Sequence, residues 1–483
     1  MFYADASLIQ FSVGLSCGAP ILFLTTPKRG DVNTETVSIK HLHPLKALES
    51  TALRASFWTA VEYGTSMTLR VVNSLLLTRL LLPAFFGEIT LVTTFVVGIN
   101  LLSDIGLAPS VIQSPHGDDV DFLNTAWTIQ VIRGILLWLV ALAICWPMAK
   151  FYQDPNLKLL LPVVAFGTII TGFNSTSLLT LSRHMGVRRL FAIDFSSQVV
   201  GLIVTVIWAY YKPSVWAIVG GGFAYNCIRL VLSHNKRVAP GISNRFCWDK
   251  KSLRGIVHFG RWILLGTALF FFASQADRLI LGKLVSFTVL GIYGIAFSLS
   301  DIPRSITLAF SSRVGFPFIS KIINLPMEEF KKTYFRYRLY VLMIGALLLS
   351  VMTVWGNLLV LHLYDHRYAE ASWMIPIFSI GLWHTLLYTT TFPVLLALGK
   401  SKYSSFGNAA YCVAIVLGIP IAFHWYGLWG AVIAVAAGDF PFYLVVLAGA
   451  TNEGIGPLWQ DLQATGIFIG FLGLCFFFKH LFV

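Results

Sequence analysis

Residues 123–148 read LNTAWTIQVIRGILLWLVALAICWPM, and this stretch decides the class of fold. It is long enough to cross the hydrocarbon core of a bilayer as an α-helix, which takes about 20 apolar residues. Its single charged side chain, Arg133, lies near the middle. A backbone that crosses lipid must satisfy its hydrogen bonds within the segment, so the stretch predicts a membrane-spanning helix.

Similar apolar runs fill most of the chain. They predict spans at 57–82, 86–112, 123–148, 157–182, 191–211, 214–234, 259–284, 288–320, 338–364, 372–398, 404–424, 427–450 and 465–483. The 483 residues are 56% hydrophobic and only 12% charged, with a mean hydropathy of +0.74. Because a soluble domain is nearer 25% charged, we expect an all-α polytopic membrane protein with about a dozen helices. The longest run, 288–320, is expected to bend at Pro303.

The charges of the loops predict the orientation. One side of the predicted topology carries Lys28, Arg29, Lys40, Lys46, Arg54, Arg183, Arg188, Arg189, Lys236, Arg237, Arg245, Lys250, Lys251, Arg254, Lys321, Lys331, Lys332, Arg336, Arg338, Lys400 and Lys402. The other side carries Lys150, Lys158, Lys212, Lys283 and Arg367. Lys and Arg accumulate in cytoplasmic loops, so we place the N-terminus and the loop 235–258 in the cytoplasm. This pattern accounts for the net charge of +13 without a nucleic-acid partner.

The longest basic loop divides the predicted spans into two groups of six. We expect a disordered or wrongly started extension at 1–50, with a weak extra membrane segment as the alternative. A six-helix lobe at 51–234, a basic cytoplasmic linker at 235–258, a second six-helix lobe at 259–450 and an extra membrane segment at 451–483 follow.

The two lobes share features at an offset of 204 residues. This offset aligns Trp58 with Trp262, Arg79 with Lys283 and Gly87 with Gly291. An offset of six spans keeps the direction of each helix, so it predicts a parallel pseudo-repeat around a central cavity, with its axis along the membrane normal.

Charged residues inside the spans are the candidate functional residues. A charge at the bilayer centre costs about 2.5 kcal/mol or more and usually faces a cavity or a partner. The candidate anion ligands are Arg70, Arg133, Arg304 and Arg278, and the candidate ion-coupling residues are Asp439, Asp301 and Asp277.

Each candidate also has a purely structural interpretation. Asp301 and Arg304 are three residues apart and could neutralise each other across one helical turn. Arg70 and Arg133 have no acidic neighbour of this kind, so they are the better candidates for binding an anion. Asp439 precedes Phe440-Pro441, where the helix is expected to break, and broken helices often mark transporter sites.

The sequence contains no signature of catalysis. The six cysteines are scattered and form no CxxC pair, the histidines have no ligand spacing, and no nucleotide-binding loop is present. We therefore expect neither an enzyme nor a cofactor nor a bound metal.

Several segments resemble a known family in the right order. They are RLLLPAFFGEITLV (79–92), DIGLAPSVIQ (104–113), LSRHMGVRRLFAIDFSSQVVG (181–201), VWAIVGGGF (215–223) and QADRLILGKLVSFTVLGIYGIAFSL (275–299). They are similar to segments of the Wzx-type polysaccharide and O-antigen flippases, within the multidrug/oligosaccharidyl-lipid/polysaccharide exporter superfamily. The N-terminal extension and the odd span count depart from that family.

The resemblance implies a function. It implies alternating access in the cytoplasmic (inner) membrane, moving an undecaprenyl-diphosphate-linked oligosaccharide for lipopolysaccharide or exopolysaccharide synthesis. It also implies coupling to an ion gradient, contact with membrane lipids and a polysaccharide polymerase machinery as partner. A drug or cation exporter of the same superfamily is the alternative. A membrane glycosyltransferase is disfavoured because the predicted outer loops are short.

Overall fold

The described part of the chain is helical throughout. The computed structural model describes residues 58, 61, 64–184, 186–311, 315, 318, 319, 322, 323, 325–400 and 402–482. The predicted extension, 1–50, lies outside these residues. Within them every regular element is a helix and no strand occurs, which confirms the all-α prediction.

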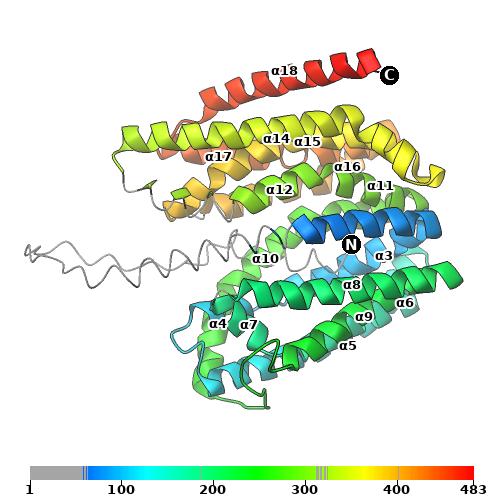
Figure 1. Cartoon of the computed structure of the whole chain (residues 1–483), viewed down its shortest axis with the longest axis vertical. Coiled ribbons are helices and arrows are strands. Elements are labelled where there is room, and N and C mark those ends of the chain that lie inside the picture. The colour runs from blue at the N-terminus through cyan, green and yellow to red at the C-terminus, as the bar shows by residue number, and fades with distance from the viewer. Residues whose placement is uncertain are drawn as a thin grey trace, which may run out of the picture.

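The helices follow the predicted apolar runs. Residues 64–234, which we call the first half, form a helix over 64–80, α3 (Pro83–Leu101), α4 (Leu107–Gln113), α5 (Val120–Tyr152), α6 (Leu157–Gly172), α7 (Ser177–Arg183), α8 (Val187–Tyr211) and α9 (Val215–His234). Residues 250–482, the second half, form α10 (Lys250–Leu284), α11 (Phe287–Ser300), α12 (Ile302–Phe310), α14 (Met327–Leu363), the 3-10 turn η3 (His366–Tyr368), α15 (Ala371–Ala397), α16 (Lys402–Ala437), α17 (Phe440–Asn452) and α18 (Leu458–Phe482). The two halves lie side by side, and α18 packs outside α14 (Figure 1).

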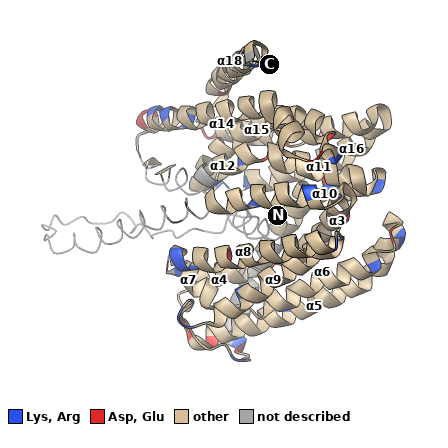
Figure 2. Cartoon of the chain, turned by 45° about the vertical axis from the view of Figure 1, so that its right-hand side comes forward, with Lys and Arg blue, Asp and Glu red and all other residues tan. Residues whose placement is uncertain are grey.

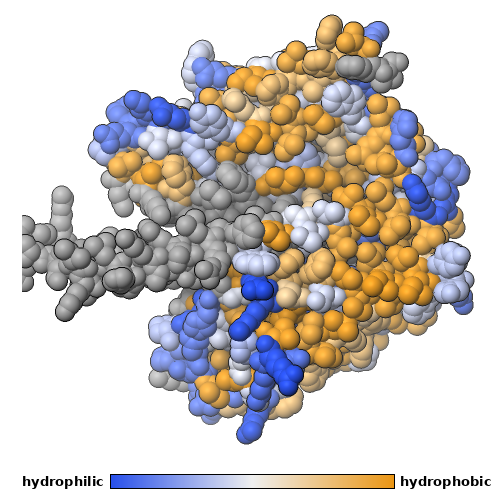
Figure 3. Space-filling model, in the orientation of Figure 1, coloured by the Kyte–Doolittle hydropathy of each residue, from blue (hydrophilic) through white to orange (hydrophobic). Residues whose placement is uncertain are grey.

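The chain is a multi-pass membrane protein. Among the described residues, eight helices are long and apolar enough to cross a bilayer, or nine if the bent pair α6–α7 is one span. Charged residues lie mostly toward the ends of the helices (Figure 2), and the surface between those ends is largely apolar (Figure 3). An apolar belt of this kind fits contact with lipid.

The predicted spans 404–424 and 427–450 appear as one apolar helical stretch among the described residues. Residues 402–452 form one apolar helical stretch of 51 residues. A straight helix of that length would measure about 75 Å, more than twice the roughly 30 Å of a bilayer core. Gly427 interrupts it with φ 58° and ψ −144°, a conformation that glycine adopts readily. The predicted boundary between the spans 404–424 and 427–450 falls at this turn.

Several spans are broken within their length. α3 and α4 are separated by residues 102–106, and α6 and α7 meet at an angle of 66°. The predicted bend in 288–320 falls at Asp301, just before Pro303, because proline is accepted in the first turn of α12. The break between α16 and α17 lies at Gly438-Asp439. Polar side chains gather at these breaks.

The two halves cross closely where α3 meets α11. A Cβ on Gly87 would lie 1.9 Å from the carbonyl oxygen of Phe287, and one on Gly291 would lie 2.0 Å from that of Pro83. Any larger residue would therefore push the helices apart. α3 and α11 also begin 204 residues apart, at Pro83 and Phe287, which is the offset found in the sequence.

The loop between the halves is bound to the first half. The Asn244 carboxamide contacts Ser175 and Thr176 at the α6–α7 break, and the backbone N–H of Cys247 donates to Thr128 in α5. α10 begins at Lys250, nine residues before the predicted span.

Candidate functional site

The first half contains a pocket beside Arg70. Its lining comes from the helix over 64–80, α3, α8 and α9: Leu69, Arg70, Asn73, Ser74, Leu77, Phe86, Ile89, Thr93, Gln198, Gly201, Leu202, Thr205, Ile218, Gly221, Gly222 and Tyr225. The cavity has a volume of about 100 Å³ and is partly open to its surroundings. Arg70 is the one charged side chain among these described residues.

One polar face of the helix over 64–80 turns toward this pocket. Arg70 and Asn73 both line it, and Ser66, one turn earlier, accepts a hydrogen bond from Gln198 in α8 at 3.4 Å. The Asn73 Oδ1 atom is buried there and has no hydrogen-bond partner among the described residues. The pocket lies among helices of the first half, so it is distinct from the central cavity that the pseudo-repeat predicts.

Arg133 lies at the break between α3 and α4. Its Nη2 donates to the Asn100 carbonyl at 2.6 Å, and its Nε donates to the carbonyl and hydroxyl oxygens of Ser103 at 3.0 and 3.1 Å. The last carbonyls of a helix lack intrahelical donors and carry partial negative charge. The partners of Arg133 therefore lie about 30 residues away in sequence. They are a hydroxyl and backbone carbonyls, which the sequence pattern did not indicate.

Asp301 and Arg304 form an ion pair at the break between α11 and α12. The Arg304 guanidinium donates to Asp301 Oδ1, and the Ser305 hydroxyl donates to Oδ2 at 2.8 Å. Their side chains are 31% (Arg304) and 17% (Asp301) exposed, so the pair is partly desolvated. This geometry agrees with the neutralising interpretation of the three-residue spacing.

Asp439 is held by three side chains of α15. Its Oδ1 contacts His384 Nε2, while its Oδ2 accepts from the hydroxyls of Thr385 at 2.5 Å and Tyr388 at 3.2 Å. Asp439 directly precedes α17, at the break in the span. The predicted break is thus present, and the residues around it are ones that sequence reasoning did not single out.

Asp277 and Arg278 lie next to each other on α10 but have different partners. The Tyr293 hydroxyl donates to Asp277, and Arg278 donates to the Gln275 side-chain oxygen. The Arg278 guanidinium also lies 5.8 Å from the Phe297 ring centroid, a cation–π distance.

These residues form one electrostatic group, which we call the second-half cluster: Asp277, Arg278, Asp301, Arg304, His384, Tyr388, Tyr411 and Asp439. Arg304 lies close enough to Asp439 for their charges to interact, and Tyr411 lies near Asp277, Arg278, Arg304 and Asp439. Three carboxylates face two guanidiniums, so the cluster carries one negative charge in excess while His384 is neutral. The structure thus brings five predicted site residues together and leaves Arg70 and Arg133 in the first half.

A comparison with known proteins decides the family. A family model described as "Polysaccharide biosynthesis protein" matches residues 76–373. The chain belongs to this family. The match contains all five quoted segments, which confirms the resemblance.

Curated relatives of this polysaccharide biosynthesis protein are distant but extensive. The lipopolysaccharide biosynthesis protein WzxC of Escherichia coli (strain K12) is 21% identical over 387 residues, covering 78% of this chain and 77% of the relative. The amylovoran biosynthesis protein AmsL of Erwinia amylovora is 20% identical over 362 residues, covering 73% and 92%.

Solved structures support the fold of the family member. An inward-facing multidrug resistance transporter of the MATE family superposes with a TM-score of 0.62 at 13% identity, covering 83% of this chain and 95% of that one. The lipid II flippase MurJ in an inward closed conformation superposes with a TM-score of 0.59 at 11% identity, covering 88% and 99%. At these identities the likeness concerns the fold alone.

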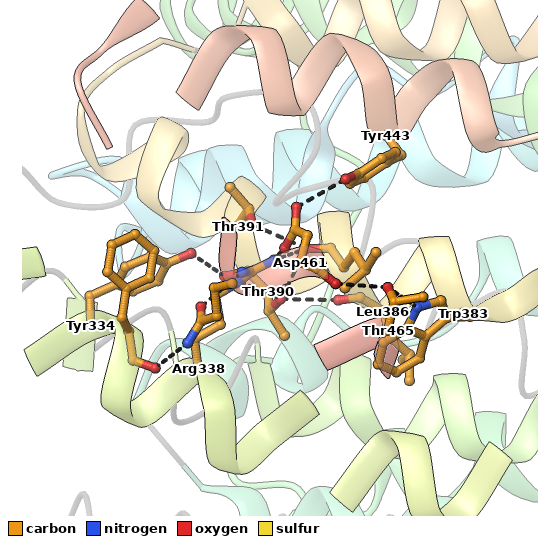
Figure 4. A network of polar contacts seen from close by, with 12 residues as sticks. Tyr334, Arg338, Trp383, Leu386, Thr390, Thr391, Tyr443, Asp461 and Thr465 are labelled. Atoms are coloured by element: carbon orange, nitrogen blue, oxygen red, sulfur yellow. Dashed lines mark hydrogen bonds and ion pairs between the residues drawn. The ribbon is translucent and has the colours of Figure 1, made fainter. Parts of the chain in front are cut away.

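A separate buried network attaches α18 in this polysaccharide biosynthesis protein. Arg338, which the sequence placed in a basic loop, is 0% exposed and pairs with Asp461 at 2.5 Å. Its other donors reach Gln460, Thr390 and the Leu387 carbonyl at 2.9–3.1 Å. Asp461 lies between Arg338 and the Tyr443 hydroxyl, with Trp383 and Thr465 in a neighbouring contact (Figure 4). We interpret this network as structural. The sequence did not indicate it, because the partners of Arg338 lie on other helices.

Proposed function

We propose that this protein is a flippase that translocates an undecaprenyl-diphosphate-linked oligosaccharide across the cytoplasmic membrane during polysaccharide biosynthesis. It would work by alternating access, without catalysis by the chain itself. The family match and the relatives named for lipopolysaccharide and amylovoran biosynthesis support this proposal. The shared fold with a lipid II flippase is consistent with it.

The observation that carries the proposal is the position of Arg70. A diphosphate must cross a low-dielectric region, where a fixed cation offsets part of its desolvation. Arginine stays charged there and binds phosphate oxygens in a bidentate manner. Arg70 lies within the apolar length of the bundle and lines a pocket with Asn73, whose buried amide oxygen accepts no hydrogen bond from the part of the chain that the structure describes.

The other candidate arginines would contribute differently. Arg304 and Arg278 would receive the cargo in the second half, Arg304 once its pair with Asp301 opens. Arg133 would have to give up its contacts with Asn100 and Ser103 to take part. Arg70 lines the pocket directly, so we place it first in binding the diphosphate.

We further propose that the second-half cluster couples transport to an ion gradient. Asp439 with His384, and then Asp301 and Asp277, would hold the coupling cation or proton that balances the excess carboxylate. A cluster with one carboxylate in excess, placed at two helix breaks, would bind and release a cation as the halves move.

The cargo site is tested in a strain that lacks the gene and carries variants on a plasmid. Arg70→Ala should abolish export and accumulate the lipid-linked precursor at normal protein abundance. Arg70→Lys should retain partial activity, because it keeps the charge but loses the planar fork. Arg189→Ala, an exposed arginine on α8, is the matched control and should export normally. Normal export by Arg70→Ala at normal abundance would refute the assignment.

The coupling site is tested with Asp439→Asn in membrane vesicles under imposed ion gradients. The variant should keep its protein abundance and lose the acceleration of flipping that a gradient gives the parent protein. A gradient response equal to that of the parent would remove Asp439 from the coupling site.

The excess carboxylate also fits the alternative, a drug or cation exporter. Cationic cargo would bind the second-half cluster directly. Drug resistance that depends on Asp439, together with normal lipid-linked intermediates in the deletion strain, would favour that alternative.

A further inference from the structure

At one end of the bundle, equivalent residues of the two halves form hydrogen bonds across the interface between the halves. Arg79 of the first half donates from Nη2 to the carbonyl of Leu363, the last residue of α14, at 3.3 Å. Lys283 of the second half donates from Nζ to the carbonyl of Phe151, in the last turn of α5, at 2.5 Å. These two cations are 204 residues apart, so equivalent residues reach across to equivalent helix ends.

A pair of tyrosines repeats the exchange. Tyr152 follows Phe151, and its hydroxyl donates to the Leu279 carbonyl of α10 at 3.1 Å. Tyr364 follows Leu363, and its hydroxyl lies 3.1 Å from Ser74 Oγ on the helix over 64–80. Each tyrosine therefore lies at the C-terminal end of a helix in its own half, α5 or α14, and contacts the first helix of the other half.

The glycine crossing lies at the same end. Gly87 faces Phe287 while Gly291 faces Pro83, again with the roles of the halves exchanged. Apart from contacts of the linker, every hydrogen bond between described residues of the two halves lies here. A self-complementary contact of this kind is what a two-fold relation produces.

The second half adds a fixed ion pair to this end. Arg367 donates to the carbonyls of Thr78 and Arg79, and Asp365 binds the same guanidinium at 2.8 Å. Hydrogen bonding from Arg367 lowers the pKa of Asp365 to about 2. The carboxylate thus stays ionised at any pH the cell meets, and it keeps Arg367 in place.

We propose that Arg79, Lys283, Tyr152, Tyr364, Gly87 and Gly291 form a reciprocal gate that closes the outer end of the transport path. The gate opens as one unit, because parting of the halves breaks both copies of each contact together. Placing it on the outer side rests on the proposed function and on the loop-charge topology. The glycines set how closely the helices approach, and the cations neutralise the negative helix ends that closure brings near them.

The gate is tested by the accessibility of a reporter cysteine at Thr90, in a full-length background whose native cysteines are serine. Thr90 is 2% exposed and faces α11, with its hydroxyl 3.5 Å from a Cβ placed on Gly294. Parting of the halves should expose it to an impermeant maleimide. Labelling is compared in intact cells and in inverted membrane vesicles.

Arg79→Ala or Lys283→Ala should each raise the labelling rate in intact cells about threefold, and the double variant about tenfold, because each contact is modest and the two add. Arg79→Lys should restore the slow rate. Gly87→Ala should label fastest if it reaches the membrane, since its Cβ meets a backbone carbonyl. Lys158→Ala, an exposed lysine at the same end, is the control and should not change the rate.

Unchanged labelling in the double variant at normal abundance would overturn the gate, and a rise only in inverted vesicles would overturn its outer placement. Labelling needs no cargo, so the gate and the proposed function can fail separately. Faster labelling without accumulation of lipid-linked precursor in the deletion strain would keep the gate and reject the flippase.

Discussion

The arginines within the helices of this chain lie in different surroundings. Arg133 is bonded to the carbonyls that end α3, whereas Arg70 lines a pocket. Arg338 is enclosed by α14, α15 and α18. The position of an arginine in a span therefore identifies a costly group but not the group that compensates it.

The first prediction concerns Arg133. Arg133→Gln should lower the thermal stability of the detergent-solubilised protein, by about 1–3 kcal/mol, because carbonyls at the α3–α4 break lose a charged donor. Export should fall only in proportion to the amount of protein in the membrane. Arg189→Gln serves as the control, with unchanged melting. Normal melting combined with lost export would instead assign Arg133 to the cargo.

At the scale of elements, the spans were predictable and most of their partners were not. Apolar length places each helix, and Pro303 and Pro441 mark breaks because proline fits the first turn of a helix best. The pair Asp301–Arg304 could also be predicted, because two residues three positions apart lie on the same face of a helix.

The remaining site residues depend on contacts between distant helices. His384 reaches Asp439 across 55 positions, and Arg338 reaches Asp461 across 123. The spacing of residues along one helix cannot predict such a pair. It shows which residues share a face, but not which other helix packs against that face. A histidine in the middle of an apolar span was the one signal that could have drawn attention to α15.

The second prediction concerns α18. Asp461→Leu should strongly reduce the protein in the membrane, because it leaves Arg338 buried without its ion partner, a change that typically costs about 3–5 kcal/mol. The double variant Arg338→Met/Asp461→Leu should recover much of that loss, since an apolar pair of similar volume needs no compensation. Abundance and melting temperature measure both. Loss in the double variant as severe as in the single one would contradict this role.

At the scale of the whole molecule, the halves share a backbone plan and differ in charge. The glycines of the α3–α11 crossing and the cations Arg79 and Lys283 are related by the same offset of 204 residues. The pocket of the first half contains an arginine, whereas the second-half cluster has one carboxylate in excess. We interpret this as a division of labour, in which one half holds the anionic cargo and the other responds to a cation.

The third prediction tests the orientation on which that interpretation depends. The linker and the gate lie at opposite ends of the bundle, so single cysteines at Ser243 and Lys158 should report opposite sides. In a background without native cysteines, an impermeant maleimide should label Lys158→Cys in intact cells and Ser243→Cys only in inverted vesicles. Both side chains are exposed, so accessibility depends on the side of the membrane rather than on burial. Labelling of Ser243→Cys in intact cells would invert the topology, and the gate would then face the cytoplasm.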